Sequence, residues 1–186
     1  MENESQVAHN NKISIGVSAC LLGEKVRYDG GHKCNQYITV LLSEHFNFIS
    51  YCPEVAIGMS IPREPIRLVD KQGEIRVTGT LDPDSDFTEQ LKGYGNDVAD
   101  SLMPLCGFIF KKNSPSCGME RVEVYAENGI PERRGTGIFA AEIIRNNPLL
   151  PVVEESSLND SLLRANFINR VYVYANLKSA DAGGYQ

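Results

Sequence analysis

Short apolar runs of strand length alternate with longer segments of helical spacing along this chain. The runs KISIGVSAC (12–20), FNFISYC (46–52) and LCGFIF (105–110) are rich in β-branched and aromatic residues, and each breaks at its carboxyl end. Strands that alternate with helices pair in parallel, because each helical crossover returns the chain to the same edge of the sheet. We therefore predict an α/β fold, a mostly parallel sheet with helices on both faces.

The remaining segments complete this order of elements. Residues 65–79 alternate apolar and polar types around a Lys-Gln-Gly turn, which predicts a hairpin projecting from the core. VEVYAENG and LLPVV predict two further short strands. Helical spacing predicts four helices, the second interrupted by Gly93 and Gly95 and the last carrying an apolar stripe. They span 35–46, 82–104, 136–147 and 158–177, and the stripe of the last is Leu162, Phe167, Val171 and Tyr174.

The length suits a single globular domain. Of the 186 residues, 42% are hydrophobic, which is enough for a substantial core. We place this α/β domain at residues 13–155. Residues 1–12 are polar and are expected to form a disordered extension, and residues 156–186 are expected to hold the last helix and a linker-like tail.

Charge and hydropathy narrow the classes of function. With 18 basic and 24 acidic residues the net charge is −6, which argues against nucleic-acid binding through phosphate neutralisation and favours a small ligand. The polar start has neither the basic flank nor the apolar core of a signal peptide, and the apolar runs are too short to cross a bilayer. We expect a cytoplasmic protein with no membrane contact.

The five cysteines form an odd set without a Cys-x-x-Cys pair, unlike a secreted disulfide framework or a zinc ribbon. Cys20, Cys52 and Cys117 follow the carboxyl ends of three predicted strands. In open α/β sheets these ends meet at a ligand-binding crevice, so the three thiols are expected to converge there. Cys34, in a polar loop, and Cys106, inside a strand, are expected to be bystanders.

Spacing alone leaves two interpretations of the strand-end thiols open. Cysteine is small and often buried, so all three fit core positions. Together they also fit a metal site, since thiolates favour zinc or iron–sulfur clusters, and three protein ligands leave one position open for substrate or water. An open position would make the site catalytic.

Two polar side chains flank the predicted crevice. Glu54 lies two residues after Cys52 and could act as a general base, or as the acid of a helix N-terminus that follows Pro53. Ser114 lies three residues before Cys117 and could face the thiols or cap a turn. Both are candidate catalytic residues.

Charged residues near the crevice are candidates for binding an anionic substrate group. Arg27 and Asp29 lie in a loop that could close over this end of the sheet, Arg63 lies between two prolines, and Lys111 follows the third strand. Simple solvation of these charges is the alternative. The Gly-Thr-Gly at 135–137 also resembles an anion-binding helix start.

The segments SACLLGEKVRYDGG, YCPEV and KKNSPSCG, in this order and each with its cysteine, together resemble the thiouracil desulfidase family over residues 13–155. The resemblance implies an α/β protein in which Cys20, Cys52 and Cys117 hold a 4Fe-4S cluster whose fourth iron has no protein ligand. It also implies that Glu54 is the catalytic carboxylate and Ser114 a catalytic serine. The stretch LLRANFINRVYVYANLK is similar to the junction that leads into a second domain in longer relatives.

The resemblance leads to the hypothesis of an iron–sulfur-dependent, non-redox hydrolytic desulfidase. It would convert a thiolated uracil base or nucleotide to the uracil form and sulfide, with Glu54 taking a proton from water. Arg27, Arg63 and Lys111 favour a substrate with a phosphate, such as a thiouridine monophosphate. The alternative is a non-catalytic metal or iron–sulfur module serving a partner domain, suggested by the junction-like helix.

Overall fold

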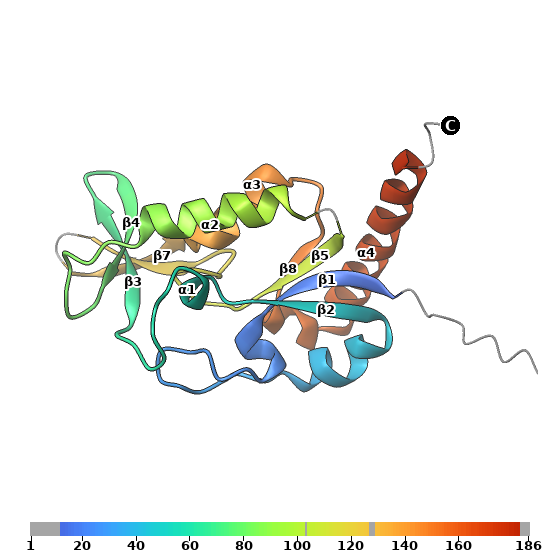
Figure 1. Cartoon of the computed structure of the whole chain (residues 1–186), viewed down its shortest axis with the longest axis horizontal. Helices are drawn as coiled ribbons and strands as arrows, with labels where there is room; N and C mark the ends of the chain where they lie inside the picture. Colours follow the sequence, from blue (N-terminus) through green and yellow to red (C-terminus); the bar gives the residue numbers. More distant parts are fainter. Residues whose placement is uncertain (1–11, 103, 127–128, 183–186) are drawn as a thin grey trace, which may run out of the picture.

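The computed structural model, which describes residues 12–102, 104–126 and 129–182, contains two four-stranded sheets (Figure 1). The first has the strand order β2-β1-β5-β8, and each neighbouring pair in it is parallel. Its first three strands in sequence fall within the predicted runs, so the predicted parallel sheet is confirmed. The strands are β1 (Ile13–Ser18), β2 (Phe46–Tyr51), β5 (Leu105–Phe110) and β8 (Val152–Glu154).

Helices cover both faces of this sheet, as predicted (Figure 1). All six residues of β5 are buried, as expected for an apolar run in the middle of a parallel sheet. On one face Phe108 packs in a cluster with Phe139, and on the other Ile15 packs in a cluster with Val171. The first cluster involves α2 (Thr88–Asp100) and α3 (Ile138–Asn146), and the second involves α4 (Ser161–Ala182).

The second sheet joins two hairpins in the order β4-β3-β6-β7. The predicted hairpin at 65–79 is confirmed, and its turn places Gln72 and Gly73 at φ of 57° and 91°, as a type I′ turn requires. It is not a separate projection, because Leu68 and Val124 pair in parallel and link it to the following hairpin. The strands are β3 (Ile66–Lys71), β4 (Glu74–Gly79), β6 (Val122–Tyr125) and β7 (Pro131–Gly135).

Strand β7 was not predicted. Its sequence, PERRG, has no apolar alternation, because four of its five residues are exposed at the edge of the second sheet. Antiparallel pairing of Val124 with Glu132 holds it in place instead. An edge strand of this kind is stabilised by its neighbour's backbone and leaves little trace in a hydropathy pattern.

The predicted helix at 35–46 is shorter and less regular than expected. It consists of one π-turn and one 3-10 turn, and its apolar spacing still buries Ile38 and Leu42. The short helical elements outside α2, α3 and α4 are η1 (Ala19–Leu22), η2 (Tyr37–Leu41), η3 (Leu42–Glu44), α1 (Pro53–Ala56) and η4 (Glu155–Asn159).

The last helix starts later than predicted. The Asp160 carboxylate accepts hydrogen bonds from the backbone N–H groups of Leu162 and Leu163, at 2.8 and 3.0 Å, which caps the first turn of α4. Phe167 and Val171 of the predicted stripe are buried, whereas Leu162 is 77% exposed. Of the predicted tail, residues 179–182 continue α4. Residues 183–186 and the predicted extension at 1–11 lie outside the described residues.

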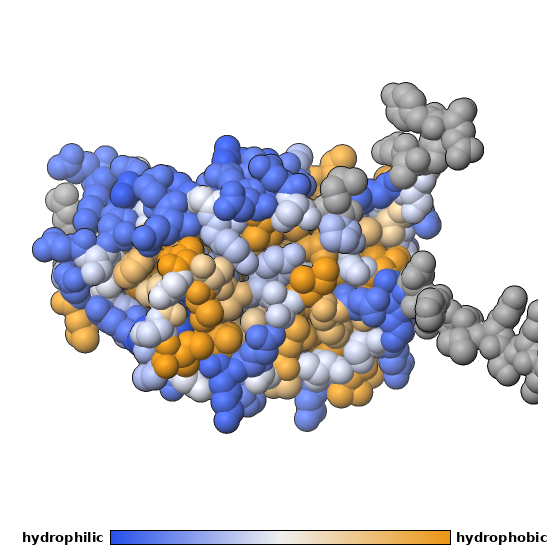
Figure 2. All heavy atoms as spheres, viewed as in Figure 1, coloured by the Kyte–Doolittle hydropathy of each residue, from blue (hydrophilic) through white to orange (hydrophobic). Residues whose placement is uncertain are grey.

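The surface is divided by hydropathy. Figure 2 shows hydrophilic residues gathered over the β3–β4 hairpin and α2, with apolar residues exposed across the middle of the same face. Within the described ranges, no helix has both the length and the apolar character needed to cross a membrane.

Helix α2 runs without a break through Gly93 and Gly95, so the predicted interruption is wrong. Gly95 is buried where α2 meets α3, and a Cβ there would lie 2.7 Å from the Cβ of Glu142. A Cβ at Gly93 would meet nothing within 4 Å. The missing side chain at 95 is therefore what allows the two helices to approach.

We expect opposite effects of the same substitution at these two glycines. Gly95→Ala should lower the free energy of unfolding by about 1–3 kcal/mol through overpacking, even though alanine favours helix. Gly93→Ala should raise it by about 0.4–1 kcal/mol, because alanine restricts the unfolded chain and fits the helix. Urea denaturation of both variants measures the difference. Equal effects at both positions would show that α2 and α3 are not packed this closely.

Candidate functional site

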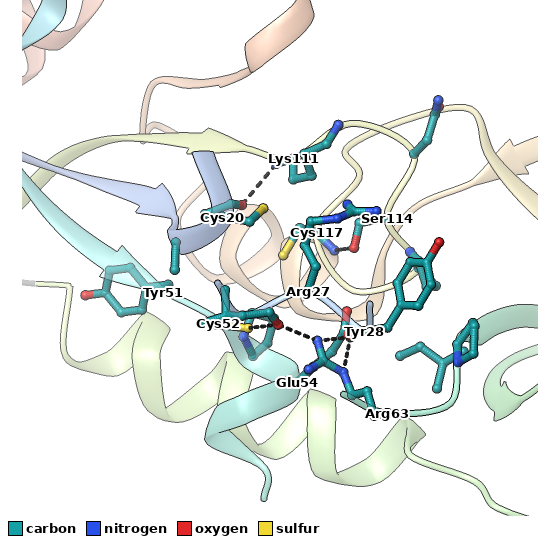
Figure 3. Close-up of a pocket in the computed structure, with 18 of the residues that line it drawn as sticks. Cys20, Arg27, Tyr28, Tyr51, Cys52, Glu54, Arg63, Lys111, Ser114 and Cys117 are labelled. Atoms are coloured by element: carbon teal, nitrogen blue, oxygen red, sulfur yellow. Dashed lines mark hydrogen bonds and ion pairs between the residues drawn. The ribbon is translucent and has the colours of Figure 1, made fainter. Parts of the chain in front are cut away.

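Three strands of the parallel sheet end at one edge, and the segments that follow them enclose a cavity of about 270 Å³ (Figure 3). Cys20 lies in η1 after β1, Cys52 follows β2 as the N-cap residue of α1, and Cys117 lies in the loop after β5. All three line the cavity, and Figure 3 shows their sulfur atoms turned towards the same space. Three thiols that are distant in sequence are thus brought together.

The other predicted site residues divide into two groups. Glu54, Ser114, Arg27, Arg63 and Lys111 line the cavity together with the cysteines. Asp29 is not among the lining residues; its side chain is 48% exposed, and its carboxylate accepts a hydrogen bond from the Gly31 N–H. The remaining lining residues are Ser18, Ala19, Val26, Tyr28, Tyr51, Pro53, Pro65, Ile66, Lys112, Asn113 and Pro115.

The two cysteines expected to be bystanders lie away from this cavity. Cys34 is exposed, with its sulfur 4.0 Å from the Thr39 hydroxyl oxygen. Cys106 is buried within β5 and packs in the cluster that faces α4. Neither lines the cavity.

Burial keeps the three cavity thiols protonated in the absence of a bound cation. It raises the pKa of Cys20 to about 11, although the positive charges of Lys111 and Arg27 act in the opposite direction. Burial also raises the pKa of Cys52, and it raises that of Cys117 well above the ordinary value. Glu54 and the other two thiols raise the pKa of Cys117 further.

The donor set is one that an iron–sulfur cluster accepts. Three soft thiols are present, which zinc and iron–sulfur clusters both accept. Within the described residues, however, no three His, Cys, Asp or Glu side chains are arranged to hold one metal ion. A cluster makes a different demand, because each thiolate binds a separate iron of a larger unit and the sulfur atoms need not meet at one point.

Glu54 belongs to a partly buried network of polar side chains. Its Oε2 accepts hydrogen bonds from Nε and Nη2 of Arg63, at 2.9 and 2.7 Å. Its Oε1 accepts one from the hydroxyl of Ser116, which is fully buried, at 2.9 Å. Arg63 also donates to the carbonyl oxygens of Val26 and Ser60. The carboxylate is therefore held rigidly at the cavity wall, with lone pairs left to accept a further hydrogen bond.

The loop that carries Cys117 is a tight turn closed by Ser114. The Ser114 Oγ accepts hydrogen bonds from the backbone N–H groups of Ser116 and Cys117, at 3.2 and 3.1 Å. The expected turn cap is thus present, and it leaves the Ser114 hydroxyl proton available to another acceptor. A catalytic donor role and a cap are compatible at this residue.

The Gly-Thr-Gly segment directs backbone N–H groups of the helix start to the cysteine loop. At the start of α3, the N–H groups of Gly137 and Ile138 donate to the carbonyl oxygens of Gly118 and Pro115, at 2.7 and 3.1 Å. A Cβ at Gly137 would lie 2.5 Å from the backbone of Ser116. The helix start therefore supports the cysteine loop, and glycine is needed for this close approach.

All three predicted substrate-binding cations have a carboxylate neighbour, and two of them form close ion pairs. Arg63 is paired with Glu54 and its side chain is only 5% exposed. Lys111 is paired with Glu155. Arg27 is the cation whose carboxylate neighbour is most distant, with its Nε 3.5 Å from Asp29 and its guanidinium over the Tyr28 ring. Arg63 and Lys111 are thus held in close ion pairs, whereas Lys112, which also lines the cavity, is a further cation at this wall.

Sequence reasoning missed four polar residues that shape the site. Ser116 gave no signal, because its partner Glu54 is 62 positions away. The remaining three, Ser18, Glu154 and Glu155, lie at the carboxyl ends of β1 and β8 and contact the cysteine loop. The strand-end rule that identified the cysteines would have identified these three residues as well.

Comparison with known proteins shows that a family model matches the part of the chain that contains the whole cavity. A model described as 2-thiouracil desulfurase matches residues 15–155. The chain is 32% identical over 154 residues to an uncharacterized protein, YbbK, of Bacillus subtilis strain 168, covering 80% of this chain and 99% of YbbK. Among solved structures it is similar to a 4Fe-4S-dependent thiouracil desulfidase, TudS, with a TM-score of 0.63 and 30% identity over 83% of this chain and 99% of that one. Neither match extends into a second domain.

Proposed function

The chain belongs to the 2-thiouracil desulfurase family, and from this premise we propose that it removes sulfur from a thiolated uracil with the help of a 4Fe-4S cluster bound by Cys20, Cys52 and Cys117. One observation carries the proposal: three thiols from three strand ends line one cavity. The similarity to a 4Fe-4S-dependent thiouracil desulfidase supports the same cofactor and substrate class. The cytoplasmic location and the domain limits at 13 and 155 stay predictions.

The reaction we propose is hydrolytic: water adds to the thiocarbonyl carbon, the carbon–sulfur bond breaks, and the products are uracil and hydrogen sulfide. No electrons are gained or lost overall. When bound, a cluster with one iron free of protein ligands supplies a Lewis acid for the thiocarbonyl sulfur. The protein must then supply a proton acceptor for the water and a proton donor for the sulfur.

Glu54 is the proton acceptor in this proposal. Arg63 and Ser116 fix both of its oxygens at the cavity wall, so the carboxylate needs no reorganisation to meet a water molecule. Ser114 is the proton donor, because its oxygen is occupied by two N–H groups and its O–H is free to turn towards the cavity. A proton thus moves from the attacking water to Glu54. Ser114 relays a second proton, which it passes to the leaving sulfur and recovers from the added hydroxyl as that group becomes the uracil carbonyl, and Glu54 returns its proton to the released sulfide.

We propose a base-sized substrate rather than one selected by its phosphate. The monophosphate hypothesis depended on three cations, two of which form close ion pairs with carboxylates. The cavity of about 270 Å³ is also slightly smaller than the range for small-molecule sites, about 300–1,000 Å³. Arg27, whose contact with Asp29 is the longest of the three, and Lys112 are the lining cations that could meet a carbonyl or an anionic group of the substrate.

The cluster assignment predicts a clear division among the cysteines. Anaerobically reconstituted protein should bind about four irons and absorb broadly in the visible range. Cys20→Ser, Cys52→Ser and Cys117→Ser should each lose the cluster, because each removes a thiolate ligand. Cys34→Ser and Cys106→Ser are matched controls, one exposed and one buried, and should retain it. Stoichiometric zinc without iron, or cluster loss in either control, would overturn the assignment.

The base assignment predicts a loss of turnover without a loss of iron. Glu54→Gln keeps the size of the side chain and should lower kcat by about 10²- to 10⁴-fold, as for other general bases, with unchanged visible absorbance. Arg63→Gln breaks the same ion pair but keeps the carboxylate, so it should retain kcat within about tenfold. Equal losses of kcat in the two loaded variants would show that Glu54 acts only through the pair.

The substrate proposal is tested by sulfide release from 2-thiouracil, 4-thiouridine and 4-thiouridine 5′-monophosphate on one loaded preparation. We expect turnover, and a gain in kcat/KM from the phosphate of less than about tenfold, since Arg63 and Lys111 are already paired. A larger gain would restore the phosphate-selective hypothesis. Absence of sulfide release from all three compounds, with a full complement of iron, would favour the alternative of a non-catalytic cluster module.

A further inference from the structure

We infer that Glu154 and Glu155, at the end of β8, are positioning residues that fix both ends of the loop carrying Ser114 and Cys117. This inference deepens the proposed function, because that loop forms one wall of the cavity. Neither glutamate lines the cavity. Each acts through the backbone or side chain of another residue.

Glu155 holds the beginning of the loop through both carboxylate oxygens. Its Oε1 accepts a hydrogen bond from the ammonium group of Lys111, and its Oε2 accepts one from the backbone N–H of Lys112 at 2.7 Å. The same ammonium group donates to the Lys112 carbonyl oxygen at 2.9 Å. The Glu155 and Lys111 side chains are only 13% and 19% exposed, so the pair is screened less by solvent than a surface ion pair.

Glu154 holds the end of the loop. Its Oε1 accepts a hydrogen bond from the Met119 N–H at 2.8 Å, two residues beyond Cys117. Glu154 is only 6% exposed and is paired in register with Phe110, the last residue of β5. The loop therefore leaves the sheet beside β8 and returns to it. Glu154 is the last residue of β8 and Glu155 is the next residue, so two consecutive glutamates reach the two ends of the cysteine loop.

A third contact shows why the beginning of the loop matters for the thiols. The Lys111 N–H donates to the Ser18 Oγ at 3.0 Å, and Ser18 and Cys117 both line the cavity. Movement of Lys111 would therefore disturb its contact with Ser18 at the end of β1 and the loop that carries Cys117. Without Glu155, the partly buried ammonium group of Lys111 and the Lys112 N–H would both lose their carboxylate acceptor. Donors left without an acceptor in a partly buried position destabilise the folded conformation of the loop.

The test uses amide hydrogen exchange of the full, cluster-loaded chain, followed by mass spectrometry of peptides covering 111–119 and 66–79. We expect Glu155→Ala to speed exchange in 111–119 by about tenfold or more, with 66–79 unchanged. Glu155→Gln should have a smaller effect, because its carbonyl oxygen can still accept the Lys112 N–H. Glu89→Gln is the matched control, since it removes the same charge from exposed ion pairs with Arg76 and Lys92, and it should leave exchange in 111–119 unchanged.

A second readout follows the cluster itself. The rate at which a chelator removes iron should rise in the same order, from wild type through Glu155→Gln to Glu155→Ala, because the loop holds one of the three ligands. Unchanged exchange in 111–119, an equal rise in 66–79, or the same response in Glu89→Gln would overturn the inference. If Glu155→Ala does not fold, Glu155→Gln alone carries the test.

These outcomes are distinguishable from failure of the proposed function. Exchange in 111–119 does not depend on turnover, so a wild-type protein that releases no sulfide leaves the loop result standing. Conversely, a wild type with full desulfidase activity and a Glu155→Ala variant with wild-type exchange would refute only the positioning role.

Discussion

The parallel pairing of β1 with both β2 and β5 is the constraint on which the rest of the structure depends. Parallel strands run in one direction, so the segments after Ser18, Tyr51 and Phe110 all leave the sheet at the same edge. Each of these segments contributes one cysteine to the cavity. An antiparallel arrangement of the same strands would send one thiol to the opposite edge, and no site with three thiols could form.

Most charged side chains around the cavity form ion pairs and hydrogen bonds within the protein. Arg63 joins Glu54 to the carbonyl oxygen of Val26, and Lys111 joins Glu155 to the start of the cysteine loop. Paired charges in partly buried positions give rigidity, which a site with several thiols at fixed separations requires. Arg27, with its longer contact to Asp29, and Lys112 are the lining cations outside these close pairs.

The features that the sequence predicted correctly are those set by neighbouring residues, and the features that it missed are set by contacts between distant elements. Burial of β5 on both faces and the type I′ turn at Gln72 and Gly73 are recorded in adjacent residues, and both were predictable. The polar edge strand β7 was not, because its stability comes from pairing with β6. Gly95 was misinterpreted as a break in α2, since its reason, contact with Glu142 of α3, lies in another helix.

By itself, the sequence determined the α/β class, the parallel sheet and the place of three cysteines just beyond strand ends, because strand patterns and chain order suffice for these features. Only the tertiary structure decided which polar side chains bond to other protein groups and which of them line the cavity. It paired Lys111 and Arg63 with carboxylates, left Asp29 outside the cavity lining, and brought Ser116 to Glu54. The physical reason is that a hydrogen bond between residues far apart in sequence depends on distances of a few tenths of an ångström, which the packing of whole elements sets and no local pattern encodes.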